Sequence, residues 1–208
     1  ARSLGAPGDE REAYLVELGT DFLSVMQSGA RELDDAFLVE GARSGDGSFH
    51  GAMVAREGLA LFGVVREMKP AVCVETGVAN GVSSAFLLKA IALNGAGKLY
   101  SIDLPGFQDG EGDAAAPDGG ALIPQGRGPG WLVPYSLRAN WELIEGSTQD
   151  HLPGLLERLG TIDFFLHDSE HSYDCMTFEY EAAIAHLRPG GVLMSHDIYA
   201  TGAFPEFI

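Results

Sequence analysis

The stretch that decides the fold is residues 71–83, Ala-Val-Cys-Val-Glu-Thr-Gly-Val-Ala-Asn-Gly-Val-Ser. Its first part, 71–76, is short, apolar on both faces and ended by a glycine, which is typical of an inner strand of a parallel sheet. A helix is predicted over 83–93. Gly77 and Gly81 allow a tight turn and a close approach to a ligand, and the free N–H groups that begin the helix favour an anion there. The stretch predicts a strand, a ligand-binding turn and a helix.

The rest of the chain repeats this alternation of apolar runs and helical patterns. Further strands are predicted over 99–104, 141–144, 162–166 and 192–195, and further helices over 53–68, 152–159 and 173–187. Pro189-Gly190-Gly191 is predicted to turn the chain into the last strand. Helices that alternate with strands apolar on both faces indicate an α/β fold with a doubly wound, mostly parallel sheet.

The length of 208 residues fits one domain with small appendages. We predict an N-terminal helical cap over 1–50 and one α/β domain over 51–208. The segment 105–134 holds eight glycines and five prolines and is predicted to be a long loop after a strand end, where open α/β sheets bind ligands. Its first half, 106–120, is typical of a disordered acidic insertion, whereas 123–138 regains apolar residues and is predicted to have a role in function.

The composition excludes several classes of partner. With 30 acidic and 13 basic residues, the net charge of −17 repels nucleic acid and anionic membranes. Cys73 and Cys175 lie far apart in apolar stretches, as buried thiols of a reduced intracellular protein do. Apolar runs stay below the roughly 18 residues of a membrane span, and residues 1–12 are too polar for a signal peptide. We therefore expect a soluble, cytoplasmic protein.

A second strand end carries an acid that suits a nucleoside. Asp103 lies at the end of the run 99–104, 22 residues beyond Gly81, where a carboxylate can accept the hydroxyls of a ribose. The turn differs from the dinucleotide fingerprint because Ala79 occupies the place of the second glycine. A nicotinamide-dependent oxidoreductase is therefore disfavoured.

These motifs together resemble the class I S-adenosylmethionine-dependent methyltransferases. Within that family they are similar to the small metal-dependent O-methyltransferases of the catechol O-methyltransferase type. The resemblance covers about residues 50–200 and implies a Rossmann-like methyltransferase fold. Residues 130–134 and 167–171 are similar to a bacterial branch that modifies natural products and sugars.

The resemblance assigns cofactor contacts to motif residues. In the pattern E-x-G-x-x-x-G-x-S, the loop holds the methionine part of S-adenosylmethionine and the serine binds its carboxylate. Asp103 falls at the ribose-binding acid, and the hydroxyl and glutamine of 146–150 fall at the adenine contacts. The implied contacts are Glu75, Gly77, Asn80, Gly81, Ser83, Asp103, Thr148, Gln149 and Asp168.

Two further strand ends carry the predicted reaction chemistry. Asp168 ends one predicted strand, and His196 with Asp197 ends the next. Neighbouring strands lie about 4.8 Å apart, so these side chains can converge on one ion. Two carboxylates and one imidazole suit Mg²⁺ or Mn²⁺. The resemblance places Mg²⁺ ligands at the same three positions, with His196 replacing a carboxylate.

The resemblance also places a general base at His171. An imidazole with an ordinary pKa near 6.5 accepts a hydroxyl proton at neutral pH. His167 is expected to point away from Asp168 because side chains alternate along a strand, so we leave it outside the site.

The predicted function is a metal-assisted O-methyltransferase that acts on a hydroxyl of a small molecule: a natural product, a sugar or a phenol. Two alternatives remain. One is a metal-independent methyltransferase in which Asp168 holds cofactor only and His171 is the sole base. The other is a non-catalytic module that binds S-adenosylmethionine or a partner.

The family carries two more strands after the fifth, yet only residues 198–208 follow here. We therefore expect a sheet that lacks its last two strands. Either the chain is shortened, or its exposed fifth strand needs the cover of a partner such as a second copy in a homo-oligomer.

Overall fold

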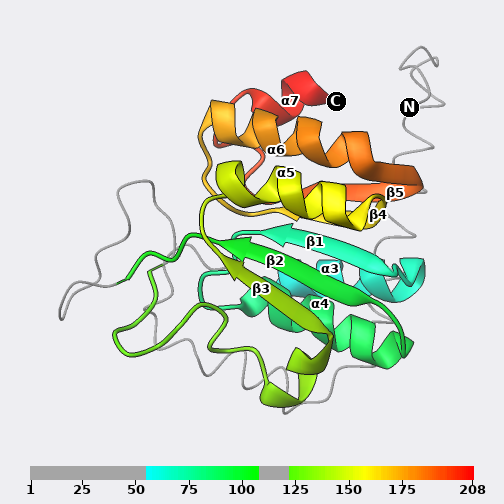
Figure 1. The fold of residues 1–208 in the computed structure, drawn as a ribbon, viewed down its shortest axis with the longest axis vertical. Helices are drawn as coiled ribbons and strands as arrows, with labels where there is room; N and C mark the ends of the chain where they lie inside the picture. Colours follow the sequence, from blue (N-terminus) through cyan, green and yellow to red (C-terminus); the bar gives the residue numbers. More distant parts are fainter. Residues whose placement is uncertain (1–54, 108–121) are drawn as a thin grey trace.

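A computed structural model describes residues 55–107 and 122–208 (Figure 1). The predicted cap over 1–50 and most of the predicted insertion over 106–120 lie outside this part. The elements in chain order are α3 (Ala55–Met68), β1 (Val72–Thr76), α4 (Val82–Asn94), β2 (Lys98–Asp103), the 3-10 helix η1 (Tyr135–Asn140), β3 (Trp141–Glu145), α5 (Thr148–Leu159), β4 (Ile162–His167), α6 (Tyr173–His186), β5 (Leu187–Ser195) and α7 (Ala203–Phe207). Among these helices, none has the length and apolar character needed to cross a membrane.

The five strands form one parallel sheet in the order β3-β2-β1-β4-β5. Helices α3 and α4 cover one face, and α5 and α6 cover the other (Figure 1). Cys73 and Phe164 pack with the first pair of helices, whereas their neighbours Val74 and Phe165 pack with the second. This two-sided burial explains why the strands are apolar throughout, and it confirms the predicted doubly wound fold.

The strand order reverses at β1, whose neighbours are β2 on one side and β4 on the other. In open α/β sheets such a switch point leaves a crevice at the carboxyl ends of the strands. The ends of β1, β2 and β4 carry Gly77, Asp103 and Asp168. The topology therefore gathers the predicted site at one edge of the sheet.

Two boundaries differ from the predicted ones by more than two residues. Helix α5 begins at Thr148 rather than 152, because the Ser147 hydroxyl caps it by accepting a hydrogen bond from the Asp150 N–H. The predicted turn at 189–191 lies inside β5. Ile162 pairs with Leu187 but Phe164 pairs with Val192, so the intervening residues of β5 bulge out of the ladder.

Glu75 of β1 ties three elements together below the turn. Its buried carboxylate accepts hydrogen bonds from Ser83 Oγ at 2.6 Å, Ser84 Oγ at 2.7 Å and Ser101 Oγ at 2.7 Å. Burial raises the pKa of Glu75 to about 7, although the three hydroxyl donors oppose this shift. The group that joins β1, α4 and β2 is therefore an acid that is hard to ionise.

The raised pKa of Glu75 should make the wild type lose stability as the pH rises, and Glu75→Gln should remove this pH dependence. The ordinary pKa is 4.5 and the folded value about 7, so in this window the folded chain binds more protons than the unfolded chain. The unfolding free energy should fall with rising pH, relative to Glu75→Gln, by up to about 3 kcal/mol and then level off. Urea unfolding at a series of pH values measures this difference. The exposed Glu157→Gln is the control, and a difference that stays constant over the window would contradict the assignment.

Candidate active site

The turn after β1 fits tightly between its neighbours. Gly77 has a φ of +81°, and a Cβ there would lie 1.9 Å from the backbone oxygen of Asp168. Gly81 has a φ of +92°, and its Cβ would lie 2.6 Å from the Cα of Gly130. Both positions need glycine because of their conformation and because other backbone segments approach them closely.

Asp103 at the end of β2 holds the turn with one carboxylate oxygen. Oδ1 accepts hydrogen bonds from the N–H groups of Val78 at 2.8 Å and Ala79 at 3.1 Å. Oδ2 is buried and has no hydrogen-bond partner within 55–107 and 122–208. Burial raises the pKa of Asp103, and the two N–H donors oppose the shift. An unpartnered buried acceptor at this place fits a ligand that donates a hydroxyl.

The later part of the long loop lies against the same turn. The N–H of Gly130 donates to Ala79 O at 2.8 Å, and the N–H of Leu132 donates to Asn80 O at 3.0 Å. The Trp131 indole N–H donates to Asn80 Oδ1 at 2.7 Å, whereas the buried Asn80 Nδ2 finds no acceptor in the part of the chain described. The turn therefore offers a free donor at Asn80 as well as the free acceptor of Asp103.

Four other predicted cofactor residues have partners within the protein. The hydroxyl of Ser83 donates to Glu75, so these two side chains satisfy each other. At the start of α5, Thr148 Oγ1 lies 3.8 Å from Cys175 Sγ, and Gln149 Nε2 donates to the same sulfur at 3.6 Å. Among the residues that the structure describes, the buried side-chain atoms of the predicted cofactor set that lack a hydrogen-bond partner thus lie at Asn80 and Asp103.

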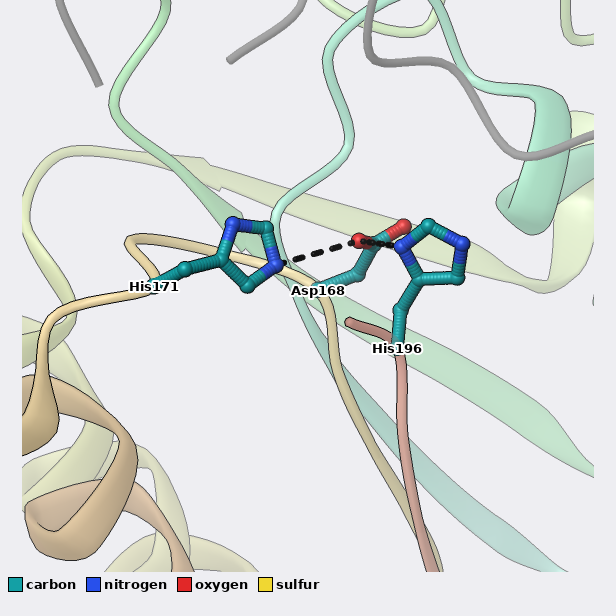
Figure 2. Close-up of side chains that lie close together, drawn as sticks. All are labelled: Asp168, His171 and His196. Atoms are coloured by element: carbon teal, nitrogen blue, oxygen red, sulfur yellow. Dashed lines mark ion pairs between the residues drawn. The ribbon is translucent and has the colours of Figure 1, made fainter. Parts of the chain in front are cut away.

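At the next strand ends, Asp168, His171 and His196 converge (Figure 2). Asp168 follows β4, His171 precedes α6 and His196 follows β5. One donor atom from each lies within 4.8 Å of the other two. His196 Nδ1 is 3.0 Å from Asp168 Oδ1 and 3.3 Å from Asp197 Oδ2, whereas His171 Nε2 is 3.8 Å and 3.7 Å from the same two oxygens.

These contacts lack hydrogen-bond geometry. His171 Nε2 and His196 Nδ1 are both buried, and neither has a hydrogen-bond partner among the described residues. Nitrogen and oxygen lone pairs that face one another repel unless positive charge lies between them. Carboxylate and imidazole donors are ligands of divalent cations, so the cluster fits a metal. Asp197, which is half-exposed with a φ of +47°, adds a second carboxylate at its rim.

The two histidines differ in their electrostatics. The neighbouring Asp168 carboxylate raises the pKa of His196 to about 9, with burial opposing. Burial lowers the pKa of His171 although Asp168 acts against this shift. Burial also raises the pKa of Asp168, and His196 opposes that change. His171 is therefore neutral at neutral pH, with a lone pair able to take a proton.

His167 lies outside the cluster, as predicted. Its ring is buried, and Nδ1 lies 2.7 Å from Glu179 Oε2. Glu179 also accepts hydrogen bonds from the hydroxyls of Thr76 and Ser169, so it forms a polar centre below the site. The pattern of the sequence did not indicate Glu179.

The comparisons with known proteins agree with this geometry. A family model described as "Methyltransferase domain" matches residues 74–198, more than half of the chain. A sequence search of curated proteins found no match.

Solved structures share the fold. Rv0187 from MTB, in a cofactor-bound structure, is 16% identical over 84% of this chain and 76% of its own, with a TM-score of 0.57. An O-methyltransferase from Bacillus cereus in complex with S-adenosylhomocysteine is 16% identical over 78% and 66%, with a TM-score of 0.54. TomG, an O-methyltransferase from Streptomyces achromogenes in complex with S-adenosylmethionine, is 19% identical over 84% and 76%, with a TM-score of 0.55. With a five-stranded parallel sheet of the same architecture and a family match over most of that sheet, the chain belongs to the methyltransferase-domain family and is a methyltransferase.

Proposed function

We propose that the domain over 51–208 transfers a methyl group from S-adenosylmethionine to a hydroxyl oxygen of a small molecule, assisted by a divalent cation. The observation that carries this proposal is the convergence on Asp168, next to the turn, of two imidazole nitrogens that have no hydrogen-bond partner among residues 55–107 and 122–208. The Bacillus cereus and Streptomyces neighbours, which share the fold, are O-methyltransferases. A natural product, a sugar or a phenol is the acceptor class that we expect.

The cofactor would lie across the ends of the first three strands. Asp103 Oδ2 would accept a ribose hydroxyl, and Asn80 Nδ2 would donate to the methionine part. Ser83 would act through its backbone N–H at the start of α4, because its hydroxyl is engaged by Glu75. Thr148 and Gln149 are the proposed adenine contacts.

Asp168, His196 and Asp197 would hold the cation. The spacings of 3.0 Å and 3.3 Å from His196 Nδ1 to the two carboxylates agree with the roughly 3 Å between neighbouring ligands of an octahedral ion with bonds of about 2.1 Å. His171 lies farther off, at 3.7 Å and 3.8 Å from the same oxygens. A bound cation supplies positive charge that orients the acceptor hydroxyl and lowers its pKa.

His171 would then remove the hydroxyl proton. Its Nε2 is buried and has no hydrogen-bond partner in the described part of the chain, and burial lowers its pKa, so the ring is neutral at neutral pH and can act as a general base. The hydroxyl oxygen would then form a bond to the methyl carbon while the bond from that carbon to the sulfonium sulfur breaks and S-adenosylhomocysteine leaves. The closely packed ends of β1 and β4 would hold the two reactants in line. Orientation of this kind contributes several kcal/mol to catalysis.

A metal-independent route is the second candidate. The pKa of His196, raised to about 9 by Asp168, leaves an imidazolium that already places a positive charge beside that carboxylate. In this route His171 is the sole base. Activity that persists after exhaustive chelation would favour it.

The first test concerns the cofactor. Calorimetric titration should show S-adenosylhomocysteine binding to the wild type, with NAD⁺ as a ligand that does not bind. Asp103→Asn keeps the acceptor for the turn but replaces the free Oδ2 by an N–H donor, so we expect at least tenfold weaker binding, roughly 1.4 kcal/mol. Absence of binding by the wild type with and without Mn²⁺, or equal binding by the variant, would refute the cofactor site.

The second test concerns the base. His171→Asn should lower turnover by at least about 10²-fold, because proton removal by a positioned base contributes that much. Transfer from labelled S-adenosylmethionine to a panel of phenols and sugars measures it, with His186→Asn at the far end of α6 as control. Binding of S-adenosylhomocysteine and Mn²⁺ should persist. If Mn²⁺ binding disappears together with turnover, His171 is a ligand and the assignment as base is wrong.

The third test concerns the metal. An imidazole donor favours Mn²⁺ over Mg²⁺, so Mn²⁺ should bind at least about tenfold more tightly in calorimetric titrations. His196→Asp replaces the imidazole by a carboxylate, so that all three proposed ligands are oxygens, and should bring the Mn²⁺ and Mg²⁺ affinities closer together. A ratio that does not change in the variant would show that His196 makes no bond to the ion.

A further inference from the structure

Glu57 on the first turn of α3 approaches the cluster from outside. Its Oε2 lies 3.3 Å from Nε2 of His196, although 139 positions separate the two residues. Further along the same helix Leu61, Phe62 and Val65 are buried in the core. Because these contacts anchor α3 against the sheet, the carboxylate of Glu57 is presented from a fixed element.

The two ring nitrogens of His196 face different groups. Nδ1 faces Asp168 Oδ1 at 3.0 Å and Asp197 Oδ2 at 3.3 Å, whereas Nε2 faces Glu57. A cation can bind Nδ1 only in the neutral form of His196, because the imidazolium has no free lone pair. A neutral imidazole carries one N–H, and a carboxylate only accepts hydrogen bonds. The proton therefore lies on Nε2, whose N–H donates a hydrogen bond to Glu57. Nδ1 keeps its lone pair, in agreement with its lack of a hydrogen-bond partner in the described part of the chain.

We propose that Glu57 is a positioning residue of the metal site: it accepts the Nε2–H of His196 and so turns the Nδ1 lone pair toward the cation. Histidines that bind metals usually donate the other ring N–H to such a partner, which fixes the tautomer and the orientation of the ring. This inference rests on the proposed metal-assisted function. It makes α3, which precedes the first strand, part of the site.

The contact has a simpler explanation with the opposite consequence. If Glu57 only pairs with a protonated His196, it holds a proton that competes with the metal. Its removal would then strengthen metal binding at neutral pH. If Glu57 positions the ligand, its removal weakens metal binding, so the sign of the change separates the two roles.

Calorimetric titration of the full chain with Mn²⁺, at saturating S-adenosylhomocysteine, tests the proposal. Glu57→Ala should weaken Mn²⁺ binding by about 10- to 100-fold. Glu57→Gln keeps an acceptor oxygen and should therefore weaken Mn²⁺ binding less than Glu57→Ala does. Glu67→Ala, at an exposed glutamate of the same helix, is the matched control and should bind Mn²⁺ as the wild type does. The affinity for S-adenosylhomocysteine should be equal in all four proteins.

A spectroscopic measurement shows whether the effect passes through His196. In the zinc-loaded wild type, histidine nitrogen NMR should show His196 with a metal-bound Nδ1 and a protonated Nε2 protected from exchange. Glu57→Ala should lose this protection. Unchanged or tighter Mn²⁺ binding by Glu57→Ala, with metal binding by the wild type intact, would overturn the role of Glu57 alone. A wild type that binds no divalent ion would overturn the role of Glu57 together with the metal-assisted function, and binding of S-adenosylhomocysteine would still report on the cofactor site.

Discussion

The contact between the ends of β1 and β4 is the constraint on which the rest of the site depends. The N–H of Asp168 donates to Thr76 O at 2.9 Å, and Gly77 lies so close to the Asp168 backbone that no side chain fits between them. The turn after β1 and the cluster after β4 are therefore two sides of one junction at the switch point of the sheet. Because the junction is made of backbone, the distance between the turn and the cluster is set by the sheet itself.

The charge of the site follows from the same junction. Glu75, Asp103 and Asp168 lie at or beside neighbouring strand ends, and burial raises the pKa of each. A desolvated carboxylate gains free energy when positive charge binds beside it. The sulfonium of S-adenosylmethionine and a divalent cation are both positive, so the proposed ligands complement the carboxylates.

Local sequence patterns are sufficient to predict the strands of the sheet and the polar residues at their ends. Apolar runs ended by glycines or acids predicted β1, β2 and β4, because burial on both faces leaves a continuous apolar pattern. What the sequence could not show are contacts between distant elements. Glu57 reaches His196 from another element, and Trp131 reaches Asn80 across a loop. Neither pair has a spacing that a pattern could reveal, since both arise from the tertiary packing. The bulge within β5 was missed because Pro-Gly-Gly predicts a turn equally well.

The cluster places one residue type in two electrostatic environments. His171 and His196 share the carboxylate of Asp168, at 3.8 Å and 3.0 Å. At the shorter distance the carboxylate outweighs burial and the pKa of the ring rises, whereas at the longer distance burial outweighs the carboxylate and the pKa falls. His196 has a further carboxylate on its other side, since Nε2 lies 3.3 Å from Oε2 of Glu57, and in the proposed site this contact would orient the ring. A difference of less than one ångström thus accompanies opposite pKa shifts of two histidines, and the proposed base, His171, is the one that stays neutral at neutral pH.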